Sequence, residues 1–304
     1  MIQIGRQWHV NHIVDDYRVV AQWYRDVFGA VDVFTDEWLD AEKRWASMVT
    51  IGDLAVDVME PTAEAAQLPL GKFLSRFGSH FHAAAYFADS GPTEIFDALA
   101  AHGVRCFGLG GAGRESMVGK PMSPVFTHPR DTAGQLEFMP FTEVKPGPLG
   151  VPGAWEDPRF VEGWSNAPWR DHPLTIEGWR VGVVVNDIDR ASGVYLALGA
   201  AVLGDEKSGA AIRRRLKLGT NTTVELIVPA SEDTVAGRDL SANGEIMHSC
   251  VFECRDLSSV ESHLSTNGVK LAEREGGRLI ADPETCYGAV FEFVEYDAST
   301  GSKP

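Results

Sequence analysis

The sequence predicts an α+β fold made of two tandem modules, each built from paired βαβββ units that form a curved mixed sheet. Two observations lead to this prediction. Segments of the first half recur in the second half in the same order, and each half alternates strand-like with short helix-like patterns. We expect one module at residues 1–141 and the other at 179–304, joined by a linker at 142–178 that is rich in proline, glycine and tryptophan.

The internal repeat extends through most of both modules. Matching segments share apolar alternation, turn glycines and closing aspartates, so the two halves are expected to share one topology. The clearest matches are HVNHIVDD (9–16) with RVGVVVND (180–187), TIGDLAVDVMEP (50–61) with KLGTNTTVELIVP (217–229), HAAAYFAD (82–89) with SCVFECRD (249–256), and LEFMPF (136–141) with FEFVEY (291–296).

The elements of the first module follow from local patterns. Residues 9–14 alternate as a strand, and apolar residues recur at helical spacing from Asp16 until Gly29, which suits a left-handed helix end. A second helix is expected near 92–102, ending at Gly103. Further strands are expected at VDVFT (31–35), RWASMVTIG (44–52), LAVDVME (54–60), the segment that begins at His82, and residues 104–107, 124–127 and 135–140.

Composition limits the classes of partner. The 304 residues carry 27 Lys and Arg against 43 Asp and Glu, a net charge of −16, which argues against nucleic acid and anionic membranes. No apolar run approaches the roughly 20 residues of a membrane helix, and the N-terminus lacks a signal pattern, so a cytoplasmic protein is expected. The four cysteines form no CxxC pair and are expected to be reduced.

Three residues have the right chemistry to hold a metal. His9 and His82 each open a strand, and Glu137 lies in a third strand. Two imidazoles and a carboxylate on converging strands suit one divalent ion, whether Fe, Mn, Co, Ni or Zn, and leave positions open for a substrate. The curved sheets are therefore expected to enclose a metal cleft.

Paired βαβββ units with these three residues resemble the vicinal oxygen chelate superfamily, which includes glyoxalase I, methylmalonyl-CoA epimerase, extradiol dioxygenases and fosfomycin or bleomycin resistance proteins. The resemblance covers about 8–141 and 179–296. It implies that the ligands are His9, His82 and Glu137, on the concave face of the sheet. Asp57 stands where glyoxalase-like and epimerase-like members carry a further ligand, and we expect it to reach the metal through water or to act as a base. By analogy, a homodimer is also expected.

The second copy lacks this set of ligands. Arg180 aligns with His9 and Ser249 with His82, and strand parity turns His248 to the opposite face. Glu225 and Glu292 remain. We therefore expect a metal-free module in which Arg180 forms a salt bridge with Glu225 or Glu292, with a small anion site at Arg180 as the less favoured alternative.

Four further residues are candidate substrate contacts. Asn11 shares strand parity with His9, and Tyr86 shares it with His82; Phe126 and His128 lie near the end of the module. The glycine-rich insertion at 106–124 is present in the first copy and is interpreted as a lid or substrate loop. The tryptophans and other aromatic residues point to a small, apolar or aromatic substrate.

Three functions are compatible with these features. The first is a glyoxalase-like or epimerase-like lyase or isomerase that works through a metal-stabilised enolate. The alternative is an Fe(II) extradiol-type ring-cleaving dioxygenase. Two departures count against it. That group usually carries its metal in the second copy, and the tyrosine typical of its motif is absent before His128-Pro129 in this chain. Tyr86 is the candidate substitute for that tyrosine. The third is a non-catalytic binding or resistance protein, which the full ligand set disfavours.

Overall fold

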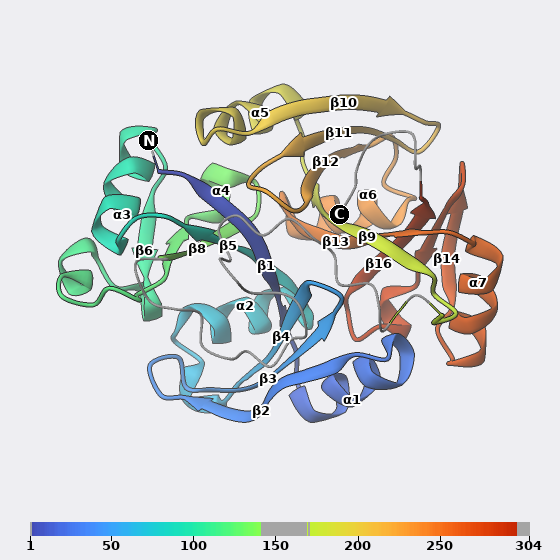
Figure 1. Ribbon diagram of the computed structural model, residues 1–304, viewed down its shortest axis with the longest axis horizontal. Helices are drawn as coiled ribbons and strands as arrows, with labels where there is room; N and C mark the ends of the chain where they lie inside the picture. Colours follow the sequence, from blue (N-terminus) through green and yellow to red (C-terminus); the bar gives the residue numbers. More distant parts are fainter. Residues whose placement is uncertain (1, 141–168, 170, 297–304) are drawn as a thin grey trace.

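The computed structural model describes residues 2–140, 169 and 171–296, which form two eight-stranded mixed sheets (Figure 1). The first sheet has the order β2-β3-β4-β1-β5-β8-β7-β6, and the second repeats it as β10-β11-β12-β9-β13-β16-β15-β14. The predicted α+β fold with two tandem modules is thus confirmed. The first eight strands are β1 (Ile4–Ile13), β2 (Val31–Leu39), β3 (Arg44–Ile51), β4 (Leu54–Pro61), β5 (His80–Ala88), β6 (Cys106–Gly108), β7 (Val125–Thr127) and β8 (Gln135–Pro140). The others are β9 (Ile176–Val184), β10 (Ala201–Lys207), β11 (Ala211–Lys217), β12 (Thr223–Pro229), β13 (Ile246–Cys254), β14 (Leu271–Glu275), β15 (Arg278–Ala281) and β16 (Val290–Glu295).

Aspartate side chains cap the first helix of each module. The Asp16 carboxylate accepts hydrogen bonds from the backbone N–H groups of Arg18 and Val19 at the start of α1 (Tyr17–Phe28), and Gly29 ends that helix with φ 62°. Asp187 caps α5 (Ile188–Ala197) in the same way. The expected helix near 92–102 is α3 (Pro92–Ala101), and its counterpart is α7 (Leu257–Thr266).

Two helices were not predicted from the sequence. They are α2 (Pro69–Phe77) and α6 (Val235–Asn243), which precede β5 and β13. Each has only nine residues and contains a glycine. A short segment with a glycine gives a weak helical pattern in the sequence, so a loop is expected there instead. A third short helix, α4 (Pro129–Thr132), precedes β8. No helix in the described part of the chain is long and apolar enough to cross a membrane.

A β-bulge at His82 changes which residues of β5 face the site. In the antiparallel pairing of β1 with β5, His12 lies opposite Phe81 and Asn11 opposite Ala83, so His82 is the extra residue. Beyond the bulge, Ala83 and Ala85 share the face of Asn11. Tyr86 therefore falls on the other face and belongs to the buried core, which contradicts its prediction as a substrate contact.

The same bulge occurs in the second module. Met247 pairs with Val183 and Ser249 with Gly182, which leaves His248 as the extra residue of β13. His248, and not Ser249, is therefore the structural counterpart of His82. The sequence alignment was wrong by one residue here because strict alternation along a strand does not allow for a bulge.

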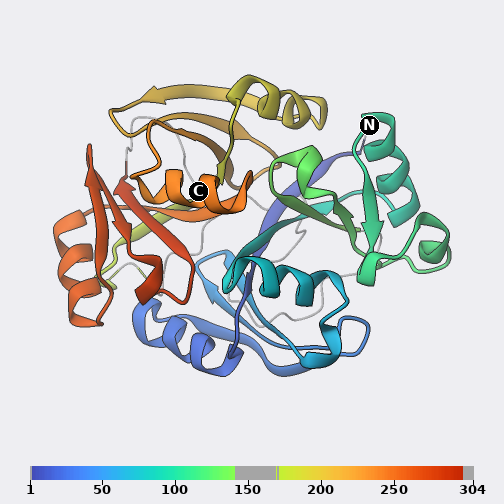
Figure 2. The same ribbon diagram turned by 180° about the vertical axis from the view of Figure 1, so that it is seen from behind.

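The two modules share one hydrophobic core. Phe28 of α1 packs against Phe252 and Phe291 of the second sheet, with ring centroids 5.5 and 5.1 Å away, and α1 lies beside the C-terminal strands in both views (Figures 1 and 2). Trp169 Nε1 donates to the Phe28 carbonyl at 2.7 Å, which ties the end of the predicted linker to the first module. Trp155 and Trp164 and the rest of 141–168 lie outside the described residues.

Candidate metal centre

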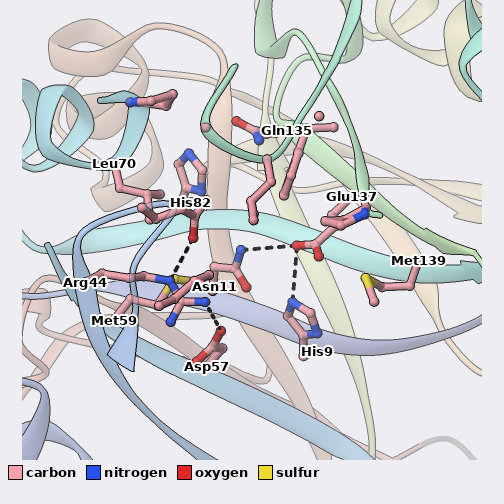
Figure 3. A pocket seen from close by; sticks show the side chains of 18 of the residues that line it. His9, Asn11, Arg44, Asp57, Met59, Leu70, His82, Gln135, Glu137 and Met139 are labelled. Atoms are coloured by element: carbon pink, nitrogen blue, oxygen red, sulfur yellow. Dashed lines mark hydrogen bonds and ion pairs between the residues drawn. The ribbon is translucent and has the colours of Figure 1, made fainter. Parts of the chain in front are cut away.

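A cavity of about 260 Å³ lies on one face of the first sheet (Figure 3). Its walls are largely apolar, and polar side chains from β1, β2, β3, β4, β5, β8 and the loop between β2 and β3 also line it. The polar residues are His9, Asn11, Glu37, Glu42, Arg44, Asp57, His82, Gln135 and Glu137. The apolar residues include Trp8, Phe34, Met48, Met59, Leu70, Phe107, Phe126 and Met139.

His9 and Glu137 meet across the small side chain of Ala85. The register places Ala85 between them, opposite His9 of β1 and opposite Glu137 of β8. His9 Nε2 lies 3.3 Å from Glu137 Oε2, and Asn11 Nδ2 donates to the same oxygen at 3.4 Å. Burial alone would raise the pKa of Glu137, but His9, the Asn11 hydrogen bond and Arg44 together lower it. Glu137 is therefore a buried, ionised carboxylate.

The His82 imidazole is buried in the same cavity and uncommitted. Burial lowers its pKa to about 4, so it is neutral at physiological pH, the form that binds metals. Its Nδ1 has no hydrogen-bond partner, and the ring packs edge-on against Phe73 of α2 with centroids 4.5 Å apart. In the second module, His248 Nδ1 lies 2.5 Å from Asp239 Oδ2. Phe73 and Asp239 are each the fifth residue of their helix. The histidine at this position thus contacts a carboxylate in the second module, whereas its counterpart in the first module has an Nδ1 without a hydrogen-bond partner.

Arg44 is a site residue that the sequence analysis missed. Its Nη2 lies 3.3 Å from Asp57 Oδ2 and its Nε donates to Glu42 Oε2 at 2.8 Å, as the dashed lines of Figure 3 show for Asp57. Burial raises the pKa of Asp57, while Arg44 and His9 act in the opposite direction. An arginine at the start of the mostly apolar strand RWASMVTI is a signal that could have identified it, because a buried cation is almost always paired with an anion.

Buried charge in the cavity is not balanced. Glu42, Asp57 and Glu137 are all at least 87% buried at their side chains, against one similarly buried guanidinium, that of Arg44. His9 Nδ1, His82 Nδ1 and Asp57 Oδ1 are buried without hydrogen-bond partners. A divalent cation would offset the surplus negative charge, and it would use imidazole nitrogens as donors. The donor chemistry therefore fits a metal.

The ligands are not drawn together as a finished cluster. Across the described residues, no group of three or more His, Cys, Asp or Glu side chains is close enough to hold a metal ion. The His9–Glu137 pair is formed, and His82 lines the same cavity apart from that pair. The three-residue metal site consequently stays a prediction.

The other candidate residues divide between two places. Asn11 and Phe126 line the cavity, and Phe126 stacks on Phe107 with centroids 5.9 Å apart. His128 caps α4, where its Nδ1 accepts a hydrogen bond from the Arg130 N–H, and it lines a different cavity. Residues 107–111 of the insertion and Pro124 border the metal cavity, as a substrate loop would. Closure of the insertion at 106–124 as a lid over the metal cavity stays a prediction.

The equivalent space in the second module contains ion pairs. Arg180 Nη1 lies 3.2 Å from Glu225 Oε2, which confirms the predicted salt bridge. Ser249 Oγ donates to Glu292 Oε1 at 2.6 Å. Arg213 and Arg278 each contact both glutamates. Guanidinium groups here supply the positive charge that a metal would supply in the first module.

Neither the family models nor the curated proteins include a match to this chain. Among solved structures, a mutant of 4-hydroxymandelate synthase from Streptomyces coelicolor is similar over 97% of this chain and 93% of its own, with a TM-score of 0.64 and 13% identity. Methylmalonyl-CoA epimerase from Mycobacterium tuberculosis is 23% identical over 41% of this chain and 91% of its own (TM-score 0.37). A hypothetical protein from Bacillus halodurans is 19% identical over 47% of this chain and 98% of its own (TM-score 0.38). The chain has the vicinal oxygen chelate fold, in its two-module form.

Proposed function

We propose that this chain is a divalent-metal-dependent enzyme that acts on a small molecule in the cavity of the first module. The observation that carries the proposal is the buried His9–Glu137 pair, together with a neutral His82 whose Nδ1 has no partner, in one cavity where buried carboxylates outnumber guanidinium groups. These three residues would hold the ion. A bound divalent ion would polarise a substrate oxygen and stabilise the negative charge that develops on it.

Asp57 is the proposed general base. It lines the cavity, and its burial raises its pKa, which makes the carboxylate a stronger base than one in water. Arg44 holds Oδ2, while Oδ1 has no hydrogen-bond partner and is available to a substrate proton. Proton removal next to a polarised carbonyl is the step that lyases and isomerases of this kind need. The apolar walls suit a small substrate that is largely apolar.

A ring-cleaving dioxygenase is the second candidate. The two-module fold, which this chain shares with 4-hydroxymandelate synthase, is compatible with it. Against it, no tyrosine is found among the cavity residues that the structure describes, and Tyr86, the expected substitute, lies in the core. The lyase or isomerase reaction is therefore preferred.

Metal content measured by mass spectrometry, on protein purified anaerobically without a histidine tag, tests the proposal. We expect about one divalent ion per chain, as a single ligand set implies. Zinc, nickel, cobalt or manganese would favour the lyase or isomerase, and iron would favour the dioxygenase. A chain that binds no metal after reconstitution would contradict the proposal.

Asp57→Asn should remove proton transfer and keep the metal. Wild-type protein is screened with small carbonyl acids and thioesters for deuterium uptake from D2O, followed by NMR. For a substrate that exchanges, we expect Asp57→Asn to slow exchange about 10²–10⁴-fold, the usual contribution of a general base. Glu60→Gln, on the same strand but outside the cavity, is the control and should exchange at the wild-type rate. Undiminished exchange in Asp57→Asn would show that another group is the base.

A further inference from the structure

A second cavity, of about 740 Å³, lies between the two modules. We call it the inter-module cavity. The first module contributes the end of α2 and the start of α4, and the second module contributes the start of α5 and the end of α6. His82 and Gln135 line both this cavity and the metal cavity, so the two spaces meet at these side chains.

Positive charge is concentrated in the inter-module cavity. Arg76, Arg130 and Arg190 line it, against a single carboxylate among its lining residues, that of Glu245. Glu245 is the ion-pair partner of Arg190. Two guanidinium charges are therefore left over, in a chain whose net charge is −16. Such a local reversal of sign attracts anionic ligands.

The two surplus arginines differ from most others in the molecule. Exposed arginines elsewhere pair with carboxylates, as Arg105 does with Asp131 and Arg274 with Glu261. Within the described residues, the arginines with no carboxylate partner are Arg76, Arg130 and Arg215. Two of these three line the inter-module cavity. The Arg76 guanidinium lies over the Phe77 ring, 4.8 Å from its centroid, which restrains it without neutralising it.

Another cavity with three arginines provides a comparison. It is lined by Arg180, Arg215 and Arg278, and also by Glu206, Glu253 and Glu295. Positive and negative charges are equal in number there, whereas the inter-module cavity has a surplus of two arginines. An anion is therefore expected to prefer the inter-module cavity.

We propose that the inter-module cavity binds an oxyanion, a phosphate or carboxylate group, at Arg76 and Arg130. Guanidinium groups bind such oxygens through paired, charge-assisted hydrogen bonds. The ligand is an elongated small molecule whose anionic end lies here and whose reacting end passes His82 and Gln135 into the metal cavity. This second statement rests on the proposed function; the anion site itself does not.

Titration calorimetry with inorganic pyrophosphate and with succinate tests the site. We expect at least one of the two to bind the wild-type chain, and the double variant Arg76→Ala/Arg130→Ala to weaken that binding by about tenfold or more. Tighter binding of pyrophosphate would indicate a phosphate end, and tighter binding of succinate a carboxylate end. Arg215→Ala is the matched control, because it removes an unpaired arginine elsewhere, and its binding should equal that of wild type. No binding, equal binding in the double variant, or loss in Arg215→Ala would overturn the proposal.

Metal content measured on the same proteins separates this proposal from the proposed function. The double variant should keep the wild-type metal content, since neither arginine lines the metal cavity. Arginine-dependent anion binding in a chain that binds no metal would retain the anion site and refute the metal enzyme. Metal binding without anion binding would refute the anion site and leave the proposed metal enzyme standing.

Discussion

His82→Ala abolishes metal binding and leaves the fold nearly as stable as wild type, whereas His248→Ala destabilises the fold and leaves the metal content unchanged. This is the expected result if the two bulge histidines have separate roles. The Nδ1 of His82 has no hydrogen-bond partner, so His82→Ala breaks no hydrogen bond at that atom and loses only ring packing on Phe73, which borders a cavity already present. The substitution takes away one of the three ligands. The two remaining ligands hold a divalent ion poorly.

His248 contributes to folding because of Asp239. This carboxylate is 2.5 Å from His248 and 3.2 Å from His80, and it accepts a hydrogen bond from Asn243 at 2.7 Å. Burial would raise the pKa of Asp239, but hydrogen bonds to His248 and His80 lower it strongly, so it is ionised. His248→Ala leaves a buried charge with fewer partners and should lower the free energy of unfolding by about 2–4 kcal/mol.

Metal per chain and urea unfolding, measured on both variants, check this prediction. Ser249→Ala is a further control, which should keep its metal. If both histidine variants lost metal to the same degree, the site would not be confined to the first module. If His82→Ala were as unstable as His248→Ala, His82 would have a structural role and the argument from its free Nδ1 would fail.

The sequence was sufficient to predict the fold because its signals are local. Asp16 and Asp187 mark helix starts and Gly29 a helix end, and the repeated alternation of the strands requires no knowledge of neighbours. It also predicted that His9 and Glu137 would meet. The bulge at His82 was not predictable, since an extra residue in one strand depends on its pairing with another. That single residue accounts for the errors at Tyr86 and Ser249.

Residues whose roles depend on the packing of distant elements were also missed. Arg44 belongs to the site because β3 lies next to β4 and its guanidinium reaches Asp57. The pairing of Phe73 with His82, and of Asp239 with His248, required two helices that the sequence analysis did not predict. Side-chain contacts of this kind depend on distances between residues far apart in the sequence, which periodicity does not give.

Arg213→Met should destabilise the protein by about 3–5 kcal/mol at pH 7, because it leaves buried glutamates without enough positive charge. Arg213 Nη1 lies 2.9 Å from Glu225 Oε1 and 3.3 Å from Glu292 Oε2, and Arg278 contacts the same two oxygen atoms. Arg215→Met is the control on the same strand: this arginine is half-buried and has no carboxylate partner, so its loss should cost less than about 1 kcal/mol. Urea unfolding measures both.

The pH dependence of the destabilisation by Arg213→Met identifies its cause. Burial would raise the pKa of Glu225 and of Glu292, but the surrounding arginines lower both. Carboxyl groups whose pKa is lower in the folded state stabilise the protein above their ordinary pKa of about 4.3, and this contribution is lost as the pH falls towards the folded values. The difference in the free energy of unfolding between wild type and Arg213→Met should therefore be largest at pH 7 and become smaller on acidification below about pH 4. A gap that stayed constant with pH would mean that Arg213 stabilises the module through packing and not through charge.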